Sequence, residues 1–183
     1  MSGHNKWSQI KHQKEIADKK RGENFSKILN TISIAARADP DPQFNPQLRS
    51  AIQKAKETNV PNENIERAIK KISEPGESLD ELIMEAYGPA GSAIVIEAIT
   101  DNRNRTVAEI KKIISDCKGK WAEPGSVTWA FKKNQTEEGI EWKAKFPQSL
   151  SKNDSAELKT FIEKLKLHDN VQKVSTNILF SEL

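Results

Sequence analysis

The chain has 183 residues, with 29 Lys and Arg against 26 Asp and Glu, and a formal net charge of +3 at neutral pH. A chain of this length can bury most of its apolar surface in one large or two small domains. Its single cysteine, Cys117, excludes an intrachain disulfide and a multi-cysteine zinc site. No apolar run approaches the roughly 20 residues of a membrane helix, and the N-terminus lacks the hydrophobic region of a signal peptide. We therefore expect a soluble, cytoplasmic protein without a cofactor or metal.

Positive charge is concentrated at the N-terminal end. The first 37 residues contain eight Lys or Arg but only three acids, so this segment is more basic than the chain as a whole. Such an asymmetry favours contact with a polyanion, and specifically with nucleic acid, over a merely solvated surface. We name residues 1–22 the arm and expect a hinge at Gly22. The residues predicted to contact nucleic acid here are Lys6, Trp7, Lys11, His12, Lys14, Lys19, Lys20 and Arg21.

Two roles are open for Trp7. Its ring can stack on an unpaired base, or it can dock on the helices that follow the arm. We prefer docking, because large aromatic side chains are usually buried. His4 and His12 are too far apart in sequence for the i, i+4 pairing that places two metal ligands on one helical face.

Amphipathic helices follow the arm. Apolar residues recur at helical spacing over about 23–38, which predicts a first helix. Residues 39–42 alternate Asp with Pro and must form a loop, because proline cannot continue a helix. Asn45 before a proline is typical of the start of a second helix, and Pro61 similarly begins a third. Their single apolar faces must pack together, so residues 23–75 are predicted to form a three-helix domain.

An acidic stretch then separates two halves of the chain. Residues 73–79 surround Pro75-Gly76, which is typical of a linker and predicts a domain boundary. The β-rich runs 82–87 and 93–100 flank the tight-turn sequence 88–91. A β-hairpin is therefore expected immediately after the boundary.

The following residues predict a helix and a second hairpin. Thr106 and Glu109 form a capping box for a helix over about 105–118, and Gly119 suits the left-handed residue after its end. Apolar and polar residues alternate over 126–132 and again over 140–146, which predicts two half-buried paired strands.

The last elements complete an α+β fold. Asp154 and Glu157 form another capping box for a helix, and 171–179 is a closing strand. From residue 93 the predicted order is βαββαβ, the ferredoxin-like arrangement. The predicted fold is thus a three-helix domain with a basic arm, followed over 80–183 by a ferredoxin-like domain with an extra preceding strand.

A second candidate site lies between a predicted strand and the helix that follows it. Arg103 and Arg105 beside unpaired helix amides can bind a phosphate. A structural role is equally open, in which Asp101 pairs with one of these arginines and Asn104 or Thr106 caps the helix.

Signals for catalysis are weak. The sequence contains no glycine-rich phosphate loop and no nucleophile elbow, and Cys117 has no cue for activation. We expect no enzymatic activity and no small-molecule substrate. The oligomeric state is left open.

Several motifs, in the same order, resemble the YebC/PmpR family. They are Met1-Ser-Gly-His-Asn-Lys-Trp7, Ile10-Lys-His12, Asp18-Lys-Lys-Arg-Gly22, Asn64-Ile-Glu-Arg-Ala-Ile-Lys-Lys71, Tyr87-Gly-Pro89 and Thr100-Asp-Asn-Arg-Asn-Arg-Thr-Val107. The resemblance is close over about 1–133 and weaker over 142–178. It implies a cytoplasmic nucleic-acid-binding protein of a family long described as probable transcriptional regulators. Relatives are linked to translation, as a mitochondrial activator of cytochrome oxidase subunit I synthesis and as bacterial factors that relieve ribosome stalling at proline runs.

The chain departs from this family at one point. Typical members resemble it with a further α+β domain inserted between the strands predicted at 126–132 and 140–146. Here only the short segment 134–139 joins them, so the resemblance implies that the inserted domain is missing. Because the flanking strands can close a hairpin directly, the remaining fold should be intact.

Two classes of function follow. The first is a regulator that binds nucleic acid, either DNA in transcription control or ribosomal RNA on the ribosome. No helix-turn-helix recognition helix is evident, and no aromatic signature of the RNA-recognition fold is present. The second class is a protein-interaction module, in which the acidic hairpin and the exposed sheet recruit a partner and the arm only makes the protein soluble.

Overall fold

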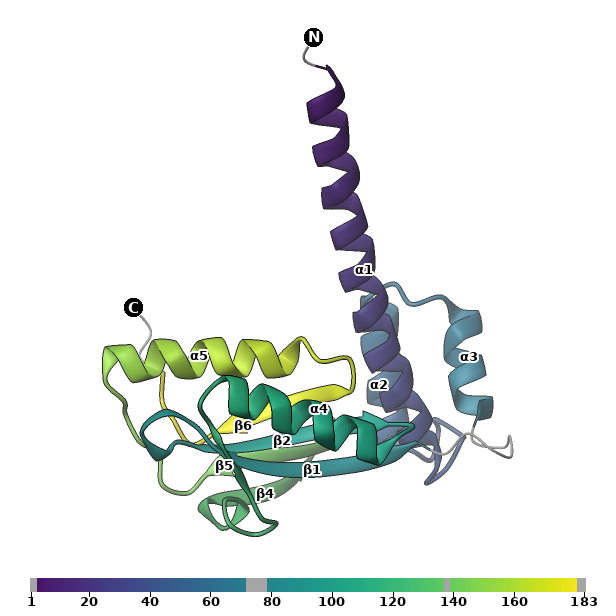
Figure 1. Ribbon diagram of the computed structural model, residues 1–183. Helices are drawn as coiled ribbons and strands as arrows, with labels where there is room; N and C mark the ends of the chain where they lie inside the picture. Colours follow the sequence, from purple (N-terminus) through teal and green to yellow (C-terminus); the bar gives the residue numbers. More distant parts are fainter. Residues whose placement is uncertain (1–2, 72–78, 137–138, 181–183) are drawn as a thin grey trace.

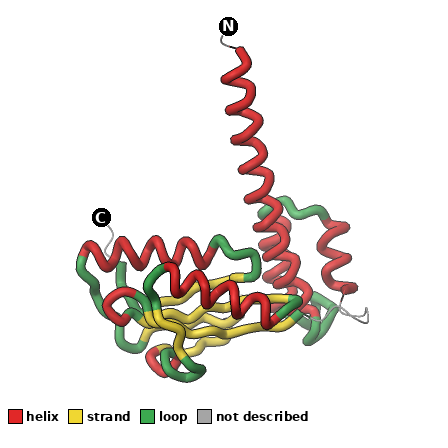
Figure 2. The backbone as a smooth tube through the Cα atoms, in the orientation of Figure 1, coloured by secondary structure: helices red, strands yellow, loops and turns green. Residues whose placement is uncertain are grey.

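The computed structural model describes residues 3–71, 79–136 and 139–180, and it confirms the α+β class (Figure 1). Helices form the N-terminal part of the molecule, and the rest consists of a layer of strands with helices lying over one of its faces (Figure 2). The N-terminal end of the first helix projects well beyond all other elements (Figure 1).

Helix α1 runs without interruption from Gly3 to Ala36. The expected helix start near residue 23, with a hinge at Gly22, is therefore wrong. A glycine in a helix interior is less favourable than alanine by only about 1 kcal/mol, which a long run of good helix formers on either side can offset. From Gly3 onward the arm is thus the first part of α1 and continues directly into the helical segment that packs on α2 and α3.

Helices α2 (Pro46–Glu57) and α3 (Asn62–Lys70) pack against the C-terminal half of α1. The predicted helix start at Asn45 is confirmed: its Oδ1 accepts a hydrogen bond from the Leu48 amide, and its Nδ2 donates to the Ala35 carbonyl. One buried side chain therefore caps α2 and holds the end of α1 beside it. The apolar core of this unit consists of Ile32, Ala36, Leu48, Ala51, Ala55, Val60, Ile65 and Ala68. Ile72 and nearly all of the predicted linker lie outside the described residues.

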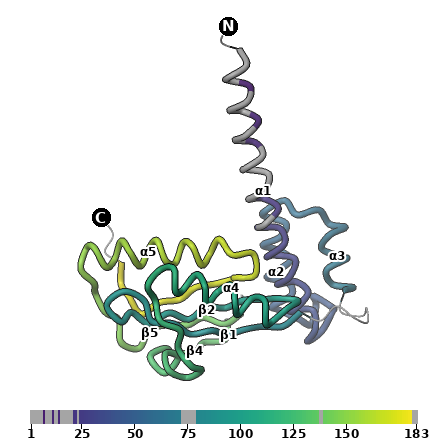
Figure 3. The backbone as a smooth tube through the Cα atoms, viewed as in Figure 1, coloured from purple at the N-terminus to yellow at the C-terminus, as the bar shows by residue number. Residues whose placement is uncertain are grey.

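A four-stranded antiparallel sheet with the order β3-β1-β2-β6 forms the centre of the second part. Its strands are β1 (Asp80–Tyr87), β2 (Ala93–Thr100), β3 (Lys120–Ala122) and β6 (Val171–Thr176). The predicted hairpin is confirmed, since β1 and β2 pair along their whole length across the turn at Pro89–Gly91. Strand β6 pairs with β2 although the two are distant in sequence (Figure 3).

Both faces of this sheet are covered. Alternate β2 residues explain how: Ile94 and Ile96 belong to the core under α4 (Arg103–Asp116) and α5 (Lys152–Lys166). Val95 belongs to the opposite core, which packs under the pair β4 (Phe131–Thr136) and β5 (Gly139–Ala144). Strand β2 is therefore apolar on both faces, as expected of a strand buried between two layers.

The second predicted hairpin differs from expectation in its start and in its partners. Residues 128–130 form a short 3-10 turn, so β4 begins at Phe131, and β4 pairs with β5 but not with the four-stranded sheet. Strand β1 occupies the position beside β2 that the predicted βαββαβ order gave to a strand of the second hairpin. The late start of β4 has its cause in Glu85, a buried β1 carboxylate that accepts hydrogen bonds from the amides of Gly125, Val127 and Thr128. Amides held by a side chain cannot join a strand ladder.

Both predicted capping boxes are wrong in position. Helix α4 is capped by Asn102, and the Thr106 hydroxyl is buried and donates to the Thr100 hydroxyl over 2.9 Å. Helix α5 is capped by Ser151, whose Oγ accepts from the amide of Asp154. In each case a better capping residue stands three or four residues upstream of the one predicted.

The end of α4 also differs from expectation. Lys118, with φ 57°, takes the left-handed conformation that was assigned to Gly119. Glycine is needed at 119 for another reason: a Cβ there would lie 2.8 Å from the ring of Phe161 in α5.

Glu97 is a partly buried carboxylate on the face of β2 that is turned toward β4 and β5, and its charge should affect the stability of the fold. This β2 carboxylate lies between Ile83 and Lys173 on the neighbouring strands, and its Oε1 is buried without a hydrogen-bond partner among the described residues. Burial raises the pKa of Glu97; Lys173 opposes this shift and Glu81 adds to it, so the pKa lies above its ordinary value.

We expect Glu97→Gln to raise the free energy of unfolding at neutral pH, because the amide removes a buried charge. The gain should vanish below pH 4.5, the ordinary carboxyl value, where the wild-type group is neutral in both states. Thermal unfolding of both proteins across this range is the measurement, with the exposed Glu141→Gln on β5 as control. A gain that persists in acid would contradict the assignment to charge burial.

Candidate nucleic-acid interface

The arm presents its described side chains on one face. Trp7, Lys11, Lys14 and Arg21 are all exposed, and Trp7 is 74 % exposed. Because they follow one another at intervals of three, four or seven residues, they form a single stripe along α1. The stripe continues at Phe25, which packs against the three-helix core. One helix face therefore changes from basic and aromatic in the arm to apolar where α2 and α3 cover it.

The other predicted arm residues are placed only by their backbone. Lys6, His12, Lys19 and Lys20 belong to α1, and their side chains lie outside what the structure describes. Their contribution to an interface stays a prediction.

The preferred docking of Trp7 on the helical unit is wrong. A helix rises 1.5 Å per residue, so Trp7 lies about 27 Å along the axis from Phe25, where α1 first enters the core. It is Arg21 that reaches this boundary, with its guanidinium carbon 5.3 Å from the centre of the Phe25 ring. The exposed indole leaves the stacking role as the remaining interpretation of Trp7.

At the second predicted site, one arginine has a structural role and the other is exposed to solvent. Arg105 pairs with Asp101 (2.6 Å), as the structural alternative predicted, and Asn102 caps the helix. Arg103 is exposed and makes no ion pair within the described residues. It lines a shallow groove of about 430 Å³ together with Lys111, a cation that sequence reasoning missed.

The arm cations lie toward the N-terminal end of α1, whereas the second predicted site, at Arg103, lies near its C-terminal end. Arg37, near the C-terminal end of α1, donates to the carbonyl of Leu79. The residue after Leu79, Asp80, pairs with Thr100, which lies three residues before Arg103. Arg21, the arm residue nearest to that end, is sixteen residues from Arg37, or about 24 Å along the helix. The arm and Arg103 are therefore separate sites or the two ends of an extended one.

The described residues offer no metal site and no membrane span. No group of three or more His, Cys, Asp or Glu in that part of the chain is placed to hold a metal ion. None of the described helices combines the length and apolar character needed to cross a membrane.

Comparison with known families decides the relationship of the chain. The model described as the TACO1/YebC protein N-terminal domain matches residues 5–75, and that of the TACO1/YebC second and third domain matches 79–136. The chain belongs to the TACO1/YebC family. The second match ends where β4 ends, and β5 begins only three residues later. This is the position where the sequence resemblance implied a missing domain.

Relatives of this TACO1/YebC family member carry regulatory names. A probable transcriptional regulatory protein from Trichlorobacter lovleyi is 53 % identical over 136 residues, which are 73 % of this chain and 55 % of that protein. One from Geobacter sulfurreducens is 51 % identical over the same length, with the same coverage of each chain. The chain thus spans about half the length of the curated relatives it matches.

A solved structure shares the fold. The crystal structure of a conserved hypothetical protein, Aq1575, from Aquifex aeolicus aligns with a TM-score of 0.81 and 29 % identity. The alignment covers 89 % of this chain and 92 % of that one.

Proposed function

We propose that this TACO1/YebC family member is a non-enzymatic regulatory protein that binds nucleic acid through the arm. The observation that carries the proposal is the exposed stripe of Trp7, Lys11, Lys14 and Arg21 on a helix that projects beyond the rest of the molecule (Figure 1). Lysine and arginine on such a helix can approach phosphates without a clash from the body of the protein. Binding would be driven by phosphate neutralisation and release of counterions.

DNA in transcription control is the first candidate target. It is supported by the names of relatives from Trichlorobacter lovleyi and Geobacter sulfurreducens, which are probable transcriptional regulatory proteins. A second candidate is ribosomal RNA, in a protein that acts on translation. The specific observation in its favour is the 74 % exposure of Trp7, because RNA loops offer the unpaired bases on which an indole stacks.

The salt dependence of duplex binding tests the shared part of the proposal. If about five phosphates are neutralised, the affinity of the full chain should fall with a log-log slope of about −4 to −5. Fluorescence anisotropy of a labelled duplex, titrated over a range of salt concentrations, measures the slope. A flat response, or unchanged affinity after residues 1–21 are deleted, would remove the arm as the binding element.

Crosslinking in cells, followed by sequencing of the attached nucleic acid, separates the two targets. Recovery of promoter DNA would support transcription control. Recovery of ribosomal RNA without promoter DNA would assign the protein to translation instead.

A further inference from the structure

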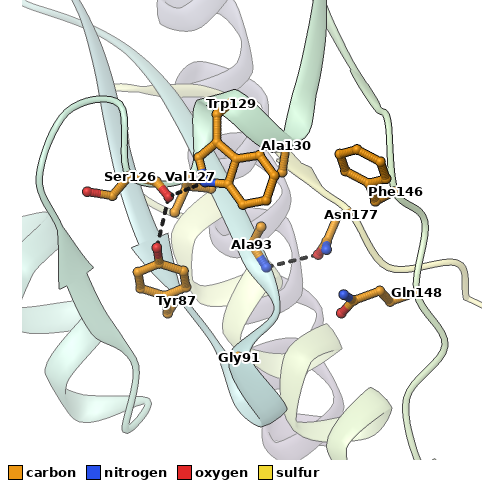
Figure 4. Close-up of a pocket in the computed structure, with 10 residues that line it drawn as sticks. All are labelled: Tyr87, Gly91, Ala93, Ser126, Val127, Trp129, Ala130, Phe146, Gln148 and Asn177. Carbon is orange, nitrogen blue, oxygen red and sulfur yellow. Dashed lines mark hydrogen bonds between the residues drawn. The ribbon is translucent and has the colours of Figure 1, made fainter.

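A pocket of about 380 Å³ opens on the side of the molecule that carries the β4–β5 hairpin. Trp129 and Phe146 form one wall, with their ring centres 6.0 Å apart, and Gly91 from the β1–β2 turn lies opposite (Figure 4). The two rings are 62 % and 58 % exposed. Paired aromatic rings that stay exposed at the mouth of a pocket are typical of a ligand-binding surface.

Small apolar residues make up much of the remaining lining, and Asn177, Gln148 and Tyr87 add polar groups to it. Asn177 is almost fully buried, and its Oδ1 accepts from the Ala93 amide over 2.9 Å. Its Nδ2 makes no hydrogen bond within the described residues, and the side-chain amide of Gln148 lies beside it (Figure 4). Tyr87 closes the far side and donates its hydroxyl to the Ser126 carbonyl. Side-chain amides next to an aromatic wall are the groups with which proteins read the edge of an unpaired base.

Three exposed lysines lie near the end of the β4–β5 hairpin that is closest to Trp129 and Phe146, while the exposed acid Glu141 stands further along β5. Lys132 and Lys143 are exposed and stand directly opposite each other on β4 and β5, although like charges in facing positions destabilise a hairpin. Lys145 is also exposed, and its Nζ donates to the carbonyl of Trp129 over 2.9 Å. Three cations within a few residues of two exposed rings favour an anionic ligand with a flat, stackable group.

We propose that this pocket binds an unpaired nucleotide of a single-stranded nucleic acid. The base would stack on the Trp129 ring, and the Phe146 ring, which is tilted by 49° to it, would pack against the side of the base. The hydrogen-bonding edge of the base would face Asn177 and Gln148, and the flanking phosphates would lie at the hairpin lysines. The proposal rests on the proposed function in that the ligand is nucleic acid, but it uses residues that are separate from the arm.

Trp129→Ala and Phe146→Ala test this assignment in the full chain. The probes are labelled oligouridine and oligothymidine of about eight nucleotides, a length typical of one single-strand site, and a duplex. We expect each variant to bind the single strands about 5- to 100-fold more weakly, since that is the usual effect of losing one base-stacking residue. Duplex affinity, which depends on the arm, should be unchanged. Preference for uridine over thymidine strands would identify RNA as the source of the nucleotide.

Matched variants separate stacking from damage to the fold. Phe44→Ala removes a still more exposed ring, 75 % exposed, from the three-helix unit and should bind all probes like wild type. Trp129→Phe keeps an aromatic face and should retain most of the single-strand affinity. If both alanine variants bound single strands with wild-type affinity, the proposal of a nucleotide pocket would be wrong. If only deletion of the arm abolished single-strand binding, the arm and not the pocket would be the single-strand site. Failure of the wild-type chain to bind any nucleic acid would overturn the proposed function as well.

Discussion

Replacement of Lys11, Lys14 and Arg21 by alanine should weaken duplex binding by about 500-fold at 0.1 M salt. Each lost phosphate contact lowers the log-log salt slope by about 0.9, so three contacts reduce it by about 2.7. Alanine is the best helix former, so α1 should keep its conformation. The measurement is again anisotropy over a range of salt concentrations, and both the affinity and the slope must change together.

A matched pair of lysines serves as control for this variant. Lys54 and Lys56 are exposed in the last turn of α2, on the helical unit rather than on the arm. Their replacement by alanine lowers the net charge by two, against three in the arm variant, and should leave the slope nearly unchanged. Equal losses in the two variants would show that binding follows net charge and not the arm.

Glu85→Gln should lower the free energy of unfolding by about 2–3 kcal/mol at neutral pH. The Glu85 carboxylate is 4 % exposed and accepts from Gly125, Val127 and Thr128, including the hydroxyl of the last. A glutamine would turn its NH₂ group toward one of these donors and leave amides unsatisfied. The change corresponds to a fall in Tm of roughly 5–10 °C, measurable by circular dichroism.

The pH dependence of this effect has a definite sign. Burial raises the pKa of Glu85, but the backbone hydrogen bonds from Gly125, Val127 and Thr128 outweigh it, so the pKa lies below its ordinary value of 4.5. Stability from this carboxylate is therefore complete above pH 4.5 and is lost as the pH falls through the lowered value. The difference between wild type and Glu85→Gln should shrink over that acid range.

Glu123→Gln is the control, because Glu123 belongs to the same loop but is exposed. It should unfold like wild type at every pH. If Glu85→Gln were equally harmless, the loop before β4 would be held by its own packing and not by the carboxylate. The loop matters for function too, because it carries Ser126 and leads into Trp129, both of which line the proposed nucleotide pocket.

Elements with strong local signals were predicted well. Helix α2 begins at Asn45 because its side chain and the following proline act within one turn, and the β1–β2 hairpin closes over a turn whose residues are adjacent in sequence. The pairing of Arg105 with Asp101 is likewise a contact between residues one helical turn apart. Such features depend on near neighbours, which a sequence displays directly.

Predictions that depended on distant residues were less successful. The alternation of Val127, Trp129 and Phe131 is typical of a strand, yet the carboxylate of Glu85, far upstream in sequence, holds the first part of that run as a loop. The docking of Trp7 failed because burial requires a neighbour within reach, and α1 carries this residue away from every other element.

The basic arm, the α+β class, the three-helix unit and the family resemblance were determined by the sequence alone, because charge, periodicity and motifs are properties of the chain itself. The tertiary structure decided that the arm is continuous with the rest of α1, that its cations and Arg103 lie far apart, and that Trp129, Phe146, Asn177 and Gln148 surround one pocket. The pocket draws on the β1–β2 turn, the loop before β4 and the segments after β5 and β6. Only packing between sheets brings such segments together, and no local pattern in the sequence records it.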